Sequence, residues 1–332
     1  MDPHVVTTRV TVLAIVALVL VDVVLVTVAF SSVRPQTDLA SSRPISRTSV
    51  SPSSSTTSGA VATPTTAVVT ARPTPTAKPA ATKPPAASAP EQQRSLVAVD
   101  AGSAWRITSG ACGTGGAVIE TTADGGHTWT RRASPYPVLA RVQPRGGGRA
   151  FVVGADLACA MGLRWTADYA QTWSDPRGVG GTWALDSADR TKVQVPSGGT
   201  ASICGGKAVL ELVRATAETA QAVCDGGAVL QSDDEGLTWA AVARVTGALA
   251  LDNRVEGGAV VAYVVAAGSG CRGLAVLAVR GGAVTPVGCV GQDPAGVTPG
   301  AVALSIVGDQ GWLLVGGTTW RSGDGMRTWG RV

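Results

Sequence analysis

The chain has 332 residues, with 27 Lys+Arg against 23 Asp+Glu, six Cys and two His. Residues 94–332 carry twenty basic and nineteen acidic side chains, and this near-neutral balance argues against a nucleic-acid binder that relies on neutralising phosphates. The histidines, His4 and His127, lie in different segments, so neither a histidine-based zinc site nor a Ser-His-Asp triad is expected in the larger segment. We expect no cofactor and no metal.

An apolar run over residues 10–30 predicts a membrane-spanning helix. It has 21 residues and would extend about 32 Å, enough for the core of a bilayer. The alternative is a cleaved signal peptide, whose apolar region is shorter and ends in a small-x-small site. Thr27-Val28-Ala29 is a poor version of that site. We therefore favour an uncleaved single-pass signal anchor in the cell membrane, with residues 1–9 as a short cytoplasmic tail.

The next segment, residues 31–93, predicts a disordered stalk. Pro, Ser, Thr or Ala occupies 44 of its 63 positions, and it contains no aromatic residue. Such a segment cannot bury enough apolar surface to offset the entropy of ordering it. Its prolines stiffen it toward an extended conformation, as in a spacer that crosses a cell wall.

Residues 94–332 predict an all-β head domain. They hold 41 of the 42 glycines and all nine tryptophans, and short Val/Ala/Leu runs alternate with glycine-rich turns. No long stretch has a helical period, which favours antiparallel strands. All six cysteines lie here, and an even number of cysteines in one domain indicates disulfides in an oxidising compartment. We expect this head outside the cytoplasmic membrane.

One eight-residue pattern, [ST]-x-D-x-G-x-T-W, recurs four times in the head, and we call each copy an octad. Its fixed residues are Thr122, Asp124, Gly126, Thr128 and Trp129 in the first octad, Thr166, Asp168, Thr172 and Trp173 in the second, Ser232, Asp234, Gly236, Thr238 and Trp239 in the third, and Ser322, Asp324, Thr328 and Trp329 in the fourth. Ala170 and Met326 replace the glycine in two copies.

The octad pattern predicts a hairpin turn. A short hydroxyl and a short carboxylate can accept backbone N–H groups a few residues on, and glycine allows a positive φ. Each octad follows a short apolar run, and we expect the Thr-Trp pair to begin the outgoing strand with its indole in the core.

The octads closely resemble the Asp-box (BNR) repeat of sialidases, sortilin-type receptors and photosystem II assembly factors. This resemblance implies a β-propeller of four-stranded blades. It places each octad between the third and fourth strands, away from the ligand-binding face, where Asp124, Asp168, Asp234 and Asp324 hold turns and do not catalyse.

The spacing of the octads predicts five or six blades. Their aspartates are 44, 66 and 90 residues apart, and a blade needs about 40–45 residues. The last interval hides a blade without an octad within Asp252–Val290, and the middle one carries an expansion in Gly178–Gly206. The strand around Trp329 could pair with Ser95–Val99 to close the ring.

The spacing of the cysteines favours three disulfides, although fifteen pairings are formally possible. Two pairs, Cys204–Cys224 and Cys271–Cys289, bracket likely hairpins at similar spacings, and elimination leaves Cys112–Cys159. No C-x-x-C motif indicates a redox or metal site.

Two kinds of function remain open. The favoured one is a non-enzymatic binding or scaffold module for an unknown protein or glycan, with Trp183 as an exposed contact and Trp165 and Trp320 in the core. The alternative, a sialidase-like glycoside hydrolase, rests on the family resemblance. It would use Arg106, in Trp105-Arg106-Ile107-Thr108, as the first of three substrate arginines and Tyr263 as the nucleophile. That family's motif has a proline where Thr108 stands, and we do not expect an enzyme.

Overall fold

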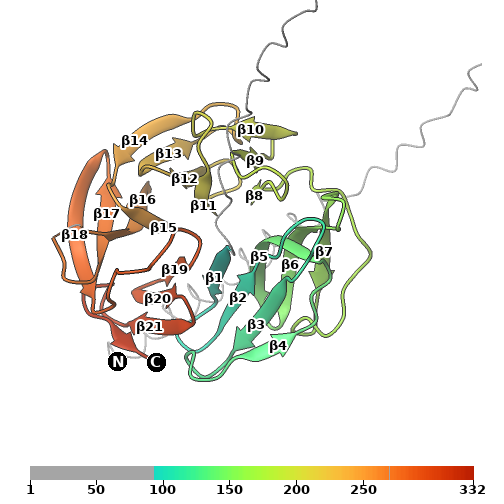
Figure 1. Ribbon diagram of the computed structural model, residues 1–332, viewed down its shortest axis with the longest axis horizontal. Helices are drawn as coiled ribbons and strands as arrows, with labels where there is room; N and C mark the ends of the chain where they lie inside the picture. Colours follow the sequence, from blue (N-terminus) through green and yellow to red (C-terminus); the bar gives the residue numbers. More distant parts are fainter. Residues whose placement is uncertain (1–92, 269) are drawn as a thin grey trace, which may run out of the picture. The chain divides into compact units, whose positions relative to one another are not determined.

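The computed structural model describes residues 93–268 and 270–332, which form 22 strands in six sheets around a common axis (Figure 1). In every sheet the strands are antiparallel and follow one another in sequence order. The described part of the chain is therefore an all-β, six-bladed propeller. It contains no helix long and apolar enough to cross a membrane. The expected tail, signal anchor and stalk up to residue 92 lie outside the described residues.

The first three blades come from residues 94–202. Blade 1 comprises β1 (Arg94–Ala98), β2 (Ala104–Thr108), β3 (Val118–Thr122) and β4 (Thr130–Arg132). Blade 2 comprises β5 (Val138–Gly146), β6 (Arg149–Ala155) and β7 (Met161–Thr166). Blade 3 comprises β8 (Ala184–Leu185), β9 (Lys192–Gln194) and β10 (Thr200–Ser202).

The last three blades have four strands each. Blade 4 comprises β11 (Val209–Arg214), β12 (Ala220–Cys224), β13 (Ala228–Ser232) and β14 (Ala240–Arg244). Blade 5 comprises β15 (Ala248–Glu256), β16 (Ala259–Ala267), β17 (Leu274–Arg280) and β18 (Ala283–Val290). Blade 6 comprises β19 (Val302–Val307), β20 (Gln310–Val315), β21 (Thr318–Ser322) and β22 (Gly330–Arg331).

The blade count resolves the two irregular octad intervals. The blade expected within Asp252–Val290 is blade 5, and the expansion at Gly178–Gly206 is blade 3. The expectation of four strands in every blade is wrong for blades 2 and 3. After the second octad, the backbone pairs with β7 only through the bridge between Leu163 and Arg177 and a hydrogen bond from Ser174 N to Trp165 O (2.8 Å). Pro176 has no N–H to donate there, and glycines follow at 178, 180 and 181, which weakens a fourth strand.

The ring closes differently from the expected strand exchange. β22, which follows Trp329, pairs with β21, and β1 pairs with β2, so the strand after Trp329 and the strand at Ser95 belong to separate sheets. The two end blades join instead by backbone and side-chain hydrogen bonds. Arg94 N donates to Gly300 O (2.8 Å) and Ala98 N to Ser305 Oγ (2.9 Å), while Trp312 and Arg321 donate to Asp100 O (3.2 Å) and Gly125 O (3.0 Å). Because residues 302–331 supply a complete sheet, blade 6 needs no strand from the start of the head.

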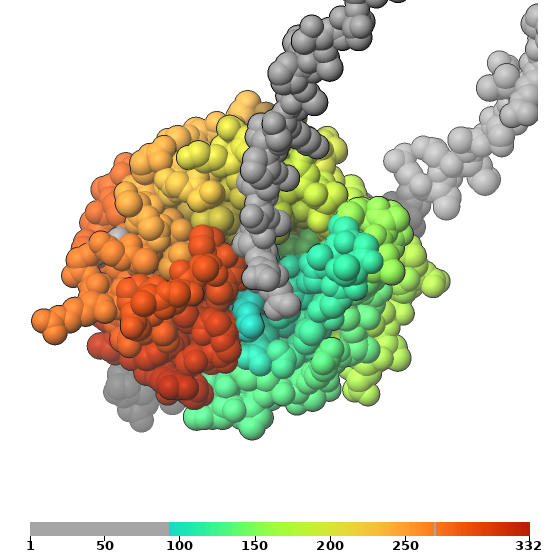
Figure 2. Space-filling model, in the orientation of Figure 1, coloured from blue at the N-terminus to red at the C-terminus, as the bar shows by residue number. Residues whose placement is uncertain are grey.

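The hydrophobic core lies between adjacent blades. One cluster joins blades 5 and 6 around Leu304 and Leu313, and another joins blades 4 and 5 around Val223 and Leu277. Blade 5 is covered on both sides, so β17 is buried along six consecutive residues. Figure 2 shows the successive segments following one another around the ring.

Candidate functional site

All four octads have the same internal hydrogen bonds. In the second, Thr166 Oγ1 donates to Asp168 Oδ1 (2.8 Å) and accepts the N–H of Ala170 (3.0 Å). The carboxylate of Asp168 also accepts the N–H (3.0 Å) and the hydroxyl (2.6 Å) of Thr172. These bonds favour the charged form and lower the pKa of Asp168 to about 2. The equivalent bonds lower the pKa values of the other three octad aspartates.

The fifth octad residue has a positive φ in every copy, including the two without glycine. Its φ is 97° at Gly126 and 88° at Gly236, against 63° at Ala170 and 68° at Met326. A Cβ atom at Gly236 would lie 2.5 Å from Val195, whereas Ala170 and Met326 are fully buried in the core. A side chain replaces the glycine where the neighbouring blade leaves room for it.

The octad tryptophans are partly buried and pack on core clusters. The Trp173 indole donates to Ala133 O (2.9 Å) in the preceding blade. The outgoing strands start one residue after the tryptophan, at Thr130, Ala240 and Gly330, and not at the Thr-Trp pair as expected. The indole therefore anchors the turn before the strand begins.

The octads lie on one face of the ring, which we call the octad face. The N–H of the fourth octad residue donates to the turn between the first and second strands of its own blade. These bonds run from Gly125 to Gly102 (2.8 Å), Tyr169 to Gly148 (2.9 Å), Glu235 to Glu218 (2.9 Å) and Gly325 to Asp309 (3.0 Å). The connections between second and third strands, such as residues 109–117, are at the other ends of the strands, on what we call the mouth face.

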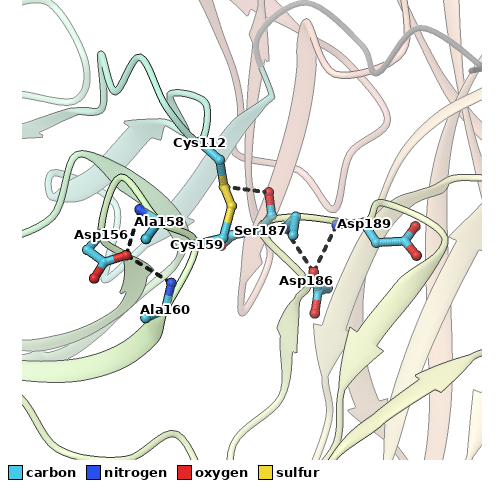
Figure 3. Close-up of a disulfide and its surroundings, with 9 residues drawn as sticks. Cys112, Asp156, Ala158, Cys159, Ala160, Asp186, Ser187 and Asp189 are labelled. Carbon is cyan, nitrogen blue, oxygen red and sulfur yellow. Dashed lines mark hydrogen bonds between the residues drawn. A yellow bond between two sulfur atoms is a disulfide. The ribbon is translucent and has the colours of Figure 1, made fainter. Parts of the chain in front are cut away.

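Three disulfides join the six cysteines in the pairing that the spacing favoured. They are Cys112–Cys159, Cys204–Cys224 and Cys271–Cys289, and the described residues contain no free cysteine. Cys112–Cys159 ties blade 1 to blade 2 through their connections on the mouth face (Figure 3). Cys112 Sγ also lies 3.4 Å from Ser187 O, at the start of the connection between β8 and β9.

A pocket of about 470 Å³ opens beside this disulfide, and we call it the mouth pocket. Its lining comes from Gln93, residues 109–112 and 114–116 of blade 1, residues 138–140 of blade 2, and residues 185–188 and Arg190 of blade 3. Three buried polar atoms of this lining have no hydrogen-bond partner in the described chain: Gln93 Oε1, Ser187 Oγ and Arg190 Nε. Such groups are costly to bury unpaired, so we expect them to bind water or a polar ligand.

The mouth pocket borders the cavities of the central channel, because neighbouring cavities share part of their lining. Leu139 and Arg190 line both the pocket and the cavity beneath it, which also includes Arg141 and Glu211. Glu211 in turn lines the channel next to Asp252. β8, beside this cavity, has only two residues, and the Arg141 guanidinium there donates to Trp183 O (2.8 Å).

Burial controls the ionisation of these channel residues. It raises the pKa of Glu211 to about 8, although the charge of Arg190 pulls in the opposite direction. It also raises the pKa of Asp252 to about 7, even though that carboxylate accepts the N–H groups of Asn253 (2.8 Å) and Ile306 (2.6 Å). Burial lowers the pKa values of Arg141 and Arg190 to about 10. The channel therefore holds two carboxyl groups that are partly protonated near neutral pH.

The residues expected to contact a ligand lie elsewhere. The prediction that Trp183 is exposed is wrong, because it is 2% exposed, packs edge-on against Trp239 and donates to Ala217 O (3.0 Å). Arg106 is paired with Glu120 (2.8 Å) and stacked on Trp129. Both side chains hold the fold together.

Of the two tryptophans expected in the core, Trp320 packs against the blade 5–6 cluster. Trp165 is 38% exposed, contrary to the prediction. It lies on β7, the last regular strand of blade 2, where no full fourth strand covers it.

Tyr263 is part of a charged cluster in blade 5. Its hydroxyl donates to Glu256 Oε1 (2.6 Å), and Glu256 also pairs with Arg254 and Arg280. Tyr263 is 4% exposed, and it lies in blade 5 whereas Arg106 lies in blade 1. The structure does not bring the two residues proposed for glycoside hydrolysis into one site. In the described residues no group of three or more His, Cys, Asp or Glu side chains could hold a metal.

Sequence reasoning missed Gln93, Arg190 and Glu211. Glu211 could have been found from the sequence, because it interrupts the apolar run Val209–Val213. A carboxyl group within a buried strand is buried with it, and buried carboxyl groups are rare. Gln93 and Arg190 lie in polar, irregular segments and could not be found in this way.

No protein-family model and no curated protein matches the chain. Among solved structures it is similar to YCF48 bound to D1 peptide (19% identity, TM-score 0.27, over 72% of this chain and 66% of that one). It is also similar to an Aleuria aurantia lectin in complex with Fucalpha1-6GlcNAc (14% identity, TM-score 0.45, over 73% of this chain and 94% of that one). A third similar structure is Trypanosoma rangeli sialidase (13% identity, TM-score 0.39, over 70% of this chain and 52% of that one). The chain spans just under two thirds of the YCF48 structure and about half of the sialidase. These likenesses concern the propeller fold alone.

Proposed function

We propose that this chain is a membrane-tethered, non-enzymatic binding module whose head binds a protein or glycan at the mouth pocket, outside the cytoplasmic membrane. The observation that carries the proposal is the group of three unpaired polar atoms, Gln93 Oε1, Ser187 Oγ and Arg190 Nε, around one pocket. Three disulfides support an oxidising, extracytoplasmic location. The apolar run at residues 10–30 supports the tether.

The mouth pocket offers both kinds of hydrogen-bonding group. Gln93 Oε1 accepts, Arg190 Nε donates, and the Ser187 hydroxyl does either. A peptide backbone and a sugar hydroxyl each satisfy such a mixture, which is why we propose a protein or a glycan. The octad carboxylates do not compete for this role, since their oxygens already accept bonds within their own turns.

A capture experiment tests this proposal. Thr114 is exposed on the rim of the mouth pocket, and Thr114→Trp should block the pocket without disturbing the core. His127→Trp, at an exposed position of the first octad, is the matched control. We expect the tagged wild-type chain and His127→Trp to capture the same envelope component. Thr114→Trp should capture at least tenfold less of it. Equal capture by all three would contradict a ligand at the mouth.

The second candidate is the glycoside hydrolase, and the hydrogen bond between Tyr263 and Glu256 is the one observation in its favour. A Tyr–Glu pair of this kind would serve as nucleophile and base. Its test is hydrolysis of fluorogenic sialosides by the wild-type chain and by Tyr263→Phe. We expect no turnover from either protein, and turnover by the wild type that Tyr263→Phe abolishes would overturn the non-enzymatic proposal.

A further inference from the structure

Blade 5 has no octad, and a groove lies where one would pack. Elsewhere the fifth octad residue lies close to the preceding blade: a Cβ atom at Gly126 would lie 3.1 Å from Thr319, and one at Gly236 would lie 2.5 Å from Val195. In blade 5 only Gly281 and Gly282 join β17 to β18. The octad face therefore keeps a groove of about 590 Å³ between blades 4 and 5, which we call the blade 4/5 groove.

One wall of the blade 4/5 groove is a directional chain of polar side chains from blade 4. Asp233 only accepts hydrogen bonds, so Gln231 must donate its Nε2 to it (2.9 and 3.0 Å). Gln231 Oε1 then accepts from Gln221 Nε2 (2.8 Å), which leaves Gln221 Oε1 at the end of the chain. That oxygen has no partner, and Gln221 is only 2% exposed. The carboxylate thus fixes the free end of the chain as an acceptor, and a ligand N–H or a water molecule can supply the donor that the described residues do not.

The rest of the groove is lined by aliphatic residues and glycines, together with Thr216 and Thr219. Val242, Val255 and Val279 line it, and Val255 is 53% exposed. The lining has no lysine or arginine, and the nearby Arg280 is paired with Glu256. The groove therefore combines an apolar floor with an unneutralised carboxylate and a buried acceptor, a combination that disfavours anions.

We propose that the blade 4/5 groove binds an extended peptide segment of a partner protein in which a lysine or arginine is flanked by aliphatic residues. The cationic head pairs with Asp233, its methylene stem and the aliphatic neighbours cover the valines, and a donor N–H satisfies Gln221 Oε1. A neutral glycan supplies donors as well, but it leaves the carboxylate unpaired and the valines without an apolar partner. The site is separate from the mouth pocket and does not depend on it.

Fluorescence anisotropy with defined probes tests this inference on the full-length chain in detergent solution. The probes are a fluorescein-labelled Ala-Val-Lys-Val-Ala peptide, the same peptide with Glu in place of Lys, and unlabelled cellotetraose as competitor. We expect the Lys peptide to bind at least tenfold more tightly than the Glu peptide. Cellotetraose should not displace it. Equal binding of the two peptides, no binding of either, or displacement by the saccharide would overturn the proposal.

Two groove variants and one control locate the binding. Asp233→Asn should weaken binding of the Lys peptide about tenfold. Asp225→Asn, the same charge change at an exposed position of blade 4 after β12, should leave it unchanged. Gln221→Leu removes the unpaired acceptor and also the donor to Gln231, whose half-buried amide can bind water instead. It should therefore weaken peptide binding and leave the melting temperature nearly unchanged. A Gln221→Leu protein that melts lower and binds normally would show a structural glutamine and contradict a ligand site.

Discussion

Two kinds of carboxyl group in this protein have opposite pKa shifts. Asp168, on the octad face, receives an N–H and a hydroxyl from Thr172, and its pKa falls to about 2. Glu211, buried in the channel, has its pKa raised to about 8. The first residue stabilises the fold when it is charged, and the second when it is protonated. The direction of the pKa shift therefore distinguishes carboxyl groups that hold turns from those buried in the channel.

Glu211 should make the protein less stable as the pH rises. Between its unfolded pKa of about 4.3 and its folded pKa of about 8, the folded state keeps a proton that the unfolded state has lost. Glu211→Gln removes this pH-dependent loss of stability, so the free energy of unfolding at pH 8 should rise by roughly 1–3 kcal/mol. Thermal melts of both proteins at pH 5 and pH 8 measure it. Asp252, which faces the same channel, acts in both proteins, so the informative quantity is the difference between them.

Asp168 should have the opposite effect. Its stabilisation is complete above an unfolded pKa of about 3.9 and is lost as the pH falls through about 2. Asp168→Ala should therefore lower the melting temperature at pH 7, with a smaller difference at pH 2. Asp175→Ala, at an exposed position beyond the same octad, is the control and should melt as the wild type. Identical melting of Asp168→Ala and wild type at pH 7 would contradict the role of the octad carboxylate.

At the scale of elements, blade 3 opens the space where the channel residues gather. β8 has two residues, and Arg141 reaches across to Trp183 O. The short strands of blade 3 could not be predicted from the sequence, because Gly178–Gly206 has neither an octad nor an alternation of apolar residues that would identify them. The octads, in contrast, predicted the turns in four blades, because the hydrogen bonds that hold each turn lie within eight consecutive residues. The mouth pocket brings Gln93 and Arg190 together from distant segments, which local pattern reasoning cannot foresee.

The disulfides should stabilise the head in proportion to the loops they close. Cys112–Cys159 spans 47 residues and Cys204–Cys224 spans 20. In the loop-entropy account each adds roughly 2–4 kcal/mol, and the longer loop gives about 0.8 kcal/mol more. Urea unfolding of the two double Cys→Ser variants measures both values. Midpoints equal to that of the wild type would mean that the cysteines contribute nothing to stability.

For the whole molecule, the proposed tether predicts a testable topology. The apolar run at residues 10–30 precedes a head with three disulfides, which an oxidising compartment supports. Protease added to intact cells, with the wall opened where one is present, should remove the head and spare a cytoplasmic control protein. Complete protection of the head under conditions that cleave a known surface protein would reverse the proposed orientation.

Site-specific photo-crosslinking in intact cells tests the central claim most directly. A benzophenone amino acid replaces Thr114 on the rim of the mouth pocket or His127 on the octad face, two exposed positions in the same blade. A binding module that uses the mouth pocket should give a discrete adduct from position 114 and none from position 127. Adducts from position 127 alone, or from neither position, would contradict it.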